Sequence, residues 1–325
     1  MFDSRQTIAI LLAVLTGLAA GQLSWIADHA IHLVVPALMA MLWSVFLHVP
    51  LRRMGAALRN LRFTGWSLGV NFIWTPLFAY GLGWLFLRDH PDLWIGLIML
   101  MVTPCTDWYL VFTGLAGGNV RLSTALLPWH LVLQLLLLPV YLLLFAGTLV
   151  RIDYGVLVQG VLLVLVVPLA LAWAFRRGAE AVRGRAWVTE RALPAVAGAQ
   201  LAFLTLAIAA MFASQGTVLL DNPIVVLRLL VPLLLFFFTT VLLAIWVSRI
   251  MRFAYPDCAS LCFATLARNS PVALAIAVVA FPDRPLIALT LVVGPLIELP
   301  VLAVVSQALL AMRHRLDPAG GSPAS

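Results

Sequence analysis

The sequence predicts an all-α polytopic membrane protein with ten transmembrane helices. Of its 325 residues, 63% are hydrophobic and only 10% are charged, which lies far outside the composition of soluble globular domains. Two hydrophobic segments are interrupted by proline and polar residues, at 103–107 and 268–271. Hydrocarbon cannot satisfy the backbone groups that such a break frees, so it survives only where it lines a protected cavity or solute site. Paired breaks are typical of secondary transporters, and two packing kinks are the alternative.

Runs of about 20 apolar residues are long enough to cross a bilayer. Ten such runs can be placed, at 7–24, 31–50, 63–87, 92–116, 122–147, 154–175, 193–213, 223–247, 258–281 and 286–312. The breaks fall in the fourth and ninth runs. No charged-then-apolar leader with a small-residue cleavage site precedes the first run, so we expect the first helix to be retained.

The arginines predict the orientation in the membrane. The chain contains no lysine, and 15 of its 20 arginines fall on one face of a ten-helix arrangement, whereas the opposite loops hold only Arg88, Arg151 and Arg284. The positive-inside rule then places both termini in the cytoplasm, with the chain in the inner (cytoplasmic) membrane. The net charge of +7 indicates topology and contact with anionic lipid headgroups, not nucleic acid.

Five spans before residue 150 and five after it predict two halves of opposite orientation. This is a 5+5 inverted repeat with discontinuous helices four and nine, in which 1–150 and 151–316 are the two repeats. Residues 317–325 are rich in proline, glycine and serine, so we expect a disordered cytoplasmic tail. Gly17 and Gly21 have the spacing of a helix that packs closely against another.

Several stretches resemble one transporter family. They are Asn71-Phe72-Ile73-Trp74-Thr75-Pro76, Gly83-Trp84-Leu85-Phe86-Leu87, Thr103-Pro104-Cys105-Thr106 and Gly294-Pro295-Leu296-Ile297-Glu298-Leu299-Pro300-Val301-Leu302. Together they resemble the arsenite efflux permeases, which belong to the bile acid:sodium symporter superfamily. The resemblance runs over nearly the whole chain and implies a ten-helix carrier with crossing discontinuous helices four and nine. It further implies export of trivalent arsenic or antimony, generally in exchange for protons.

Cys105 is the predicted centre of the substrate site. It follows Pro104, where the second half of helix four begins, and the amino end of a half-helix favours a thiolate or an oxygen-rich solute. A thiol is also a soft ligand suited to a metalloid, although a small buried apolar residue is the alternative. We expect polar residues near the breaks to bind substrate with it, and these are Thr106, Asn269, Ser270 and, on helix three, Asn71.

Three charged residues lie deep in the predicted membrane region. Glu298, on helix ten between two prolines, is predicted to carry protons, and a protonated carboxyl that joins two helices is the alternative. Asp107 and Arg268 flank the two breaks and are hypothesised to form an ion pair. In the functional interpretation Arg268 holds an anionic or oxyanion substrate while Asp107 exchanges protons.

The chain also departs from the relatives it resembles. No glutamate follows Asn269 in helix nine, and the glutamate and glutamine with which sodium-coupled members bind sodium are absent there. Sodium coupling is therefore not expected. Helix five reads Trp129-His130 where the arsenite permeases tend to show Asn-Asp, and His130 and Gln134 are one helical turn apart. A proton relay or a satisfied buried imidazole would each explain His130.

The three cysteines predict no disulfide framework. Cys258 and Cys262 are four residues apart on helix nine, where they are either packing residues or soft-metal ligands. Besides arsenite efflux, an organic-anion carrier of the same superfamily remains open. An enzyme or receptor lacks support, because no His-Glu-x-x-His, Gly-x-Ser-x-Gly or phosphate-binding motif occurs. We expect no cofactor and no bound metal, and as partners only the metalloid, protons and the bilayer.

Overall fold

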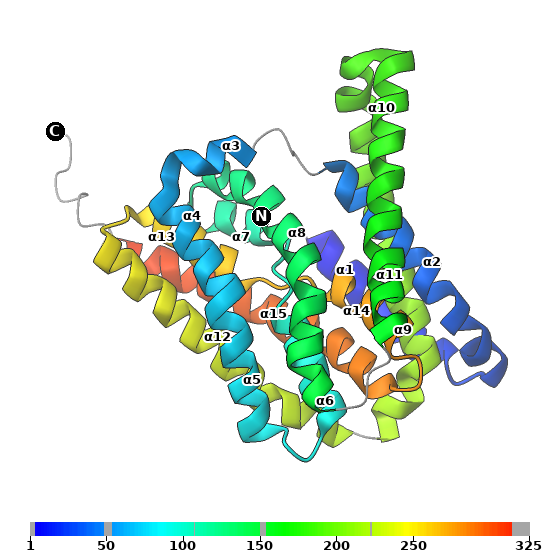
Figure 1. Cartoon of the computed structure of the whole chain (residues 1–325). Helices are drawn as coiled ribbons and strands as arrows, with labels where there is room; N and C mark the ends of the chain where they lie inside the picture. The colour runs from blue at the N-terminus through cyan, green and yellow to red at the C-terminus, as the bar shows by residue number, and fades with distance from the viewer. Residues whose placement is uncertain (1–3, 49–53, 107, 150–153, 222, 314–325) are drawn as a thin grey trace. The chain divides into compact units, whose positions relative to one another are not determined.

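The computed structural model describes residues 4–48, 54–106, 108–149, 154–221 and 223–313, and Figure 1 labels its helices. In these ranges every element is helical, and the only extended pairing is an isolated bridge between Pro104 and Arg268. The all-α prediction is therefore confirmed. The predicted tail 317–325 and Asp107 lie outside the described residues.

Contacts divide the chain into two compact units, and each unit takes segments from both halves of the sequence. Unit 1 comprises 1–49, 151–226 and 271–292, and unit 2 comprises 50–150, 227–270 and 293–325. Contacts group residues that lie close in space, whereas the predicted repeat divides the sequence into two successive halves. The predicted repeat boundary at residue 150 therefore stays a prediction.

Unit 1 is built around α2 and α11, which lie side by side (Figure 1). Its helices are α1 (Ser4–Ala20), α2 (Ser24–His48), α9 (Tyr154–Val161), α10 (Val167–Trp187), α11 (Leu193–Asp221), α14 (Ser270–Ala280) from Pro271 onward and the start of α15 (Pro285–Ala311). The π-helical turns Leu162–Val166 and Val188–Ala192 connect α9, α10 and α11. Gly17 and Gly21 of α1 face the backbone of Ala209 and Ala213 on α11, where an added Cβ would collide with a carbonyl oxygen. The close packing expected from the glycine spacing is confirmed.

Unit 2 contains both predicted breaks. Its elements are α3 (Met54–Ala57), α4 (Leu61–Gly69), α5 (Thr75–Phe86), α6 (Pro91–Met101), α7 (Trp108–Leu115), α8 (Val120–Leu144), α12 (Pro223–Met251, from Leu227 onward) and α13 (Tyr255–Leu266). From α14 (Ser270–Ala280) unit 2 takes only Ser270, and from α15 (Pro285–Ala311) it takes the part from Val293 onward. Short turns at Leu58–Asn60, Val70–Trp74 and Ala146–Thr148 complete it.

Proline explains the π-helical turns. The turns that end at residues 74, 166 and 192 are each followed two residues later by a proline, at positions 76, 168 and 194. Proline lacks the N–H of a helical hydrogen bond and its ring crowds the carbonyl four residues earlier. One widened turn accommodates the ring without ending the helix. In unit 2 this places Asn71 in the widened turn Val70–Trp74, between α4 and α5, within the predicted third span.

Five helical runs are long and apolar enough to cross a membrane: Ser24–His48, Val120–Thr148, Val158–Ser214, Leu227–Met251 and Pro285–Ala311. The shorter apolar helices α6 and α14 accompany them. A multi-pass membrane protein is thus confirmed, whereas the count of ten spans stays a prediction. The run Val158–Ser214 has 57 residues and holds two predicted spans, so the arginine-rich connection between them is helical, with Gly184 at φ 80° as a kink.

The centre of unit 2 is formed by the two helices that precede the breaks. Every residue of α6 from Leu93 to Met101 is buried, and so is every residue of α13 from Cys258 to Leu266. Gly294 of α15 lies against Leu100 of α6, so close that a side chain there would collide. The two helices that lead into the breaks are therefore buried in the core of unit 2.

Candidate crossing site of helices four and nine

The two predicted breaks are real, and they lie against each other. Helix α6 ends at Met101 and α7 begins at Trp108, while α13 ends at Leu266 and α14 begins at Ser270. Within these breaks, among the described residues, the two segments pair antiparallel at Pro104 and Arg268. The sequence interpretation of helices four and nine as discontinuous is confirmed for these elements.

Backbone hydrogen bonds hold the two extended segments together. The N–H of Cys105 donates to the carbonyl of Ala267 at 3.0 Å, and the N–H of Asn269 donates to the carbonyl of Thr103 at 2.6 Å. These are groups that the breaks remove from helical hydrogen bonding. Since a buried backbone group without a partner is costly, each break satisfies the other, and neither would be stable alone.

Arg268 binds the carboxyl ends of both interrupted helices. Its guanidinium Nη1 donates to the carbonyl of Met101, the last residue of α6, at 2.7 Å. Its Nε donates to the carbonyl of Leu266 at 3.2 Å, and Nη2 donates to the carbonyl of Thr265, both in the last turn of α13. The last carbonyls of a helix lack helical partners and carry partial negative charge. The side chain, only 2% exposed, therefore neutralises two helix ends at once.

An aromatic ring covers the guanidinium. The Cζ of Arg268 lies 5.0 Å from the ring centroid of Phe236 on α12. A cation over an aromatic face is attracted by the negative charge of the ring face. The arginine is thus fixed by three carbonyls and one ring, all within unit 2, rather than extended toward a headgroup.

Glu298 reaches the same place from α15. Its Oε1 accepts a hydrogen bond from the backbone N–H of Arg268 at 2.8 Å, and the residue is 3% exposed. The predicted intramembrane acid therefore contacts the break of helix nine directly. Whether it carries protons is not tested by this geometry and stays a prediction.

Cys105 lies at the amino end of α7, as predicted. Its Sγ accepts a hydrogen bond from the N–H of Trp108 at 3.2 Å, so the sulfur sits where the first free amides of the half-helix point. Nearby, Asn269 Nδ2 donates to the hydroxyl of Thr106 at 3.4 Å. Cys105, Thr106 and Asn269 are all buried, as is Ser270, which begins α14. The structure therefore brings together four predicted substrate residues with Arg268 and Glu298.

Asn71 lies one helical turn away from this cluster. Its Nδ2 donates to the carbonyl of Ala264 on α13 at 2.8 Å and to the carbonyl of Ser67 at 3.0 Å. It therefore joins the turn Val70–Trp74 to α13, the helix that precedes the second break. The ion pair of Asp107 with Arg268 stays a hypothesis, because Asp107 lies outside the described residues.

The sequence predicted only part of the polar cluster that Ser67 and His130 form beside Asn71. His130 Nε2 lies 3.4 Å from Ser67 Oγ and 3.5 Å from Asn71 Nδ2. Within the described part of the chain His130 Nδ1, Asn71 Oδ1 and both side-chain polar atoms of Gln134 are buried without a hydrogen-bond partner. Ser67 was missed, and its spacing of four residues from Asn71 is the signal that points to it.

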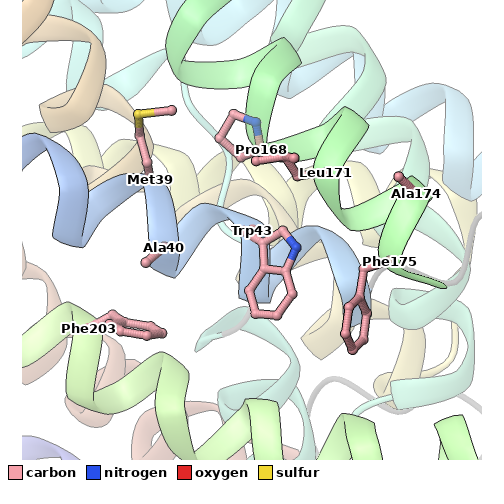
Figure 2. A pocket seen from close by; sticks show the side chains of 8 residues that line it. All are labelled: Met39, Ala40, Trp43, Pro168, Leu171, Ala174, Phe175 and Phe203. Atoms are coloured by element: carbon pink, nitrogen blue, oxygen red, sulfur yellow. The ribbon is translucent and has the colours of Figure 1, made fainter. Parts of the chain in front are cut away.

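The described residues contain no group of three histidine, cysteine, aspartate or glutamate side chains placed to hold a metal ion. The expectation that the protein uses no cofactor stays a prediction. An open hollow of about 600 Å³ lies in unit 1 (Figure 2). Its lining from α2, α10 and α11 is apolar except for the indole nitrogen of Trp43, so it offers a surface for acyl chains and no chemistry for a polar solute.

Comparison with known proteins agrees with this architecture. The Arsenical-resistance protein Acr3 of Corynebacterium glutamicum is 29% identical over 265 residues, which is 78% of this chain and 71% of that protein. Acr3 of Alkaliphilus metalliredigens is 25% identical over 224 residues, 69% of this chain and 63% of that protein. An uncharacterized transporter of Synechocystis, slr0944, is 24% identical and aligns with 93% of this chain and 86% of its own length.

These similarities confirm the resemblance to arsenite permeases that the sequence motifs indicate. The model of the family described as "Sodium Bile acid symporter family" matches residues 35–222, more than half of the chain. With several membrane-crossing helices and two paired helix breaks, the chain is a multi-pass membrane transporter that belongs to the sodium bile acid symporter family.

Proposed function

We propose that this transporter exports trivalent arsenic across the cytoplasmic membrane in exchange for protons. The observation that carries the proposal is the position of the Cys105 thiol at the amino end of α7, beside the paired breaks. Two relatives named arsenical-resistance proteins support the choice of substrate. Antimonite is, like arsenite, a soft species that suits a thiol ligand, so we include it as a substrate.

The thiol is the group that would recognise the metalloid. Cys105 Sγ accepts the N–H of Trp108, and the helix end stabilises negative charge on sulfur. Thr106 and Asn269 add oxygen and amide groups suited to the hydroxyls of arsenous acid. Cys105→Ser retains a polar atom at that place but removes the soft ligand.

Arsenite transport into everted membrane vesicles tests this role. Cys105→Ser should reduce accumulation sharply at equal protein abundance in the membrane, while Thr113→Ser, a change of similar size in α7, should leave it near the wild-type level. Normal accumulation by Cys105→Ser would mean that the thiol takes no part in transport.

The proton, not sodium, is the coupling ion that the site favours. In other transporters the carboxyl ends of half-helices and unwound carbonyls coordinate sodium. Here the carbonyls of Met101, Thr265 and Leu266 already have the guanidinium of Arg268 as their cation. Glu298 is the acid in contact with that site, and we propose it as the proton carrier, with Asp107 as a second candidate.

An organic anion is the alternative substrate, as the family description suggests. In that case Arg268 would bind a carboxylate with guanidinium N–H groups that the carbonyls leave over, and Cys105 would be incidental. The vesicle assay separates the two functions when arsenite, antimonite and a bile-acid-like anion are offered with and without a proton gradient. Accumulation of the organic anion alone would favour the alternative.

We also propose the ten-span inverted repeat with both termini in the cytoplasm. Unit 1 takes the first two spans of each predicted half together with 271–292, and unit 2 takes spans three to five of the first half with span eight and the larger parts of nine and ten of the second. Apart from 271–292, corresponding spans of the two halves thus enter the same unit, which is what an inverted repeat produces. Reporter fusions after Arg62, Arg88, Arg185 and Arg313 test the orientation, because the proposal places only Arg88 outside.

A further inference from the structure

Two thiols form a close pair on α13, away from the crossing site. Cys258 and Cys262 are four residues apart on this helix, so their side chains lie on the same face. Side chains at this spacing on a helix have Cβ atoms about 5–6 Å apart, so the two thiols are neighbours. Both are buried, at 2% and 0% exposure, and neither forms a disulfide. The sulfur atoms are therefore already side by side and in the reduced form.

The surroundings of the pair are polar on one side. The end of α12 brings a hydroxyl, Ser248, and a cation, Arg249, near the thiol of Cys258. The hydroxyl proton of Ser248 is donated to the carbonyl of Ala244 at 2.7 Å. The hydroxyl proton of Ser248 is therefore already bound within α12.

This pair is a different place from the crossing site. Cys258 and Cys262 precede Leu266, the last residue of α13, by eight and four residues, which is about 12 and 6 Å along the helix axis. Cys105 is hydrogen-bonded at the break itself, to Ala267 and Trp108.

We propose that Cys258 and Cys262 form a dithiol site for trivalent arsenicals, and the proposal deepens the export function proposed above. Arsenous acid would exchange two hydroxyls for two sulfurs: two As–S bonds form and two As–O bonds break. Each departing hydroxide takes the proton of one thiol and leaves as water. No oxidant or reductant is needed, because arsenic stays trivalent and each sulfur stays at the thiolate level.

The number of ligands favours an arsenical over a metal ion. Structural zinc sites in proteins take four protein ligands, and catalytic ones take three. In the part of the chain that the structure describes, no third histidine, cysteine, aspartate or glutamate completes such a group. Trivalent arsenic with two thiolates needs only one further ligand, which its own hydroxyl provides.

The proposed orientation gives the site a place on the export route. Arg249, whose charge acts on the Cys258 thiol, is one of the arginines that the positive-inside rule places at the cytoplasmic face. A dithiol there would meet cytosolic arsenicals before the crossing site does. It would raise their local concentration at the start of the path that ends at Cys105.

The chain has only three cysteines, so Cys105→Ser leaves this pair as its only thiols. Purified Cys105→Ser protein is reduced, incubated in its folded state with phenylarsine oxide, and weighed intact by mass spectrometry. The expected product is one adduct per chain, formed with loss of one water, resistant to a monothiol wash and removed by a dithiol. The adduct should be lost when Cys258→Ala or Cys262→Ala is added.

Binding through one thiol should be about 100-fold weaker or more, because the second bond of the pair forms within one molecule. Size-exclusion profiles confirm that each variant is folded, and Ser260→Ala in the Cys105→Ser background is the control that should retain the adduct. An adduct that persists with one thiol, or that forms only after unfolding, would overturn the proposal. Because the assay measures thiols and not transport, a chain that binds but does not export arsenite would refute only the export function.

Discussion

Replacing Glu298 by glutamine separates proton coupling from structure. Glu298 Oε1 accepts the backbone N–H of Arg268 at 2.8 Å in a buried place, and glutamine retains an oxygen there. A hydrogen bond to a charged group contributes about 1.5–3 kcal/mol and one between neutral groups about 0.5–1.5 kcal/mol. The loss of stability should therefore be about 1 kcal/mol, too little to unfold the protein, while the ability to bind and release a proton is removed completely.

Two transport measurements on vesicles distinguish the roles. Accumulation of arsenite driven by a proton gradient should vanish in Glu298→Gln, because a permanently neutral side chain cannot couple to protons. Exchange of labelled for unlabelled arsenite should survive, because alternating access does not require the charge. Glu298→Met is the matched variant, since it removes the acceptor and leaves the Arg268 N–H unpaired at about 1–3 kcal/mol. Only this second variant should lower the melting temperature markedly.

The result that would refute this reasoning is a Glu298→Gln protein that still accumulates arsenite against its gradient with unchanged pH dependence. The coupling role would then move to Asp107, or proton exchange would leave the mechanism. Loss of both accumulation and exchange, in a protein with wild-type stability, would instead make Glu298 a part of the substrate site.

Two further predictions concern the crossing site and its packing. Arg268→Met leaves the carbonyls of Met101, Thr265 and Leu266 without a side-chain donor, at about 1–3 kcal/mol for each buried carbonyl. Sodium should then bind these carbonyls and raise the melting temperature of the variant but not of the wild type. A wild type stabilised by sodium would contradict the assignment of Arg268 as the built-in cation. Gly83→Ala should destabilise by about 1–3 kcal/mol, because the new Cβ would collide with the ring of Trp94. Gly81→Ala, where nothing lies within 4 Å, is its control, and equal losses would show that helix propensity, not packing, decides.

The positions of the two helix breaks could be predicted because particular residue types, proline and polar residues, cause them. Proline 104 and proline 271, each flanked by polar residues within an apolar run, mark where helical hydrogen bonding fails, and the structure interrupts the helices within a residue or two of those places. The thiol at the amino end of α7 follows from the same reasoning. Composition likewise predicts the all-helical class, because the bilayer admits few other folds.

The partners of Arg268 could not be predicted in this way. The sequence suggests a charged partner for a buried arginine and therefore pointed to Asp107, whereas the described partners are main-chain carbonyls and a phenyl ring. Every residue has a carbonyl, so a site built from carbonyls leaves no trace in residue identity. Only the geometry of two crossing helix ends reveals it.

The helical connection of 176–191 was missed for a related reason. Its arginines are typical of a cytoplasmic loop, but arginine is also a good helix former. An ion pair within the segment, between Arg176 and Glu180 at 3.2 Å, supports the helical form. Charge therefore predicted the side of the membrane and carried no information about the backbone.

The hydrogen bond between Glu298 and Arg268 would give the proposed proton exchange a structural consequence. The backbone N–H of Arg268 donates to Glu298, and the guanidinium of the same residue donates to the carboxyl ends of α6 and α13. A proton on Glu298 weakens a charge-assisted hydrogen bond to a neutral one. That change falls on the residue whose backbone pairs with Pro104, the neighbour of Cys105. Protonation of the acid and occupancy of the thiol would therefore act on the same pair of extended segments, which is the physical link that exchange between a proton and a metalloid requires.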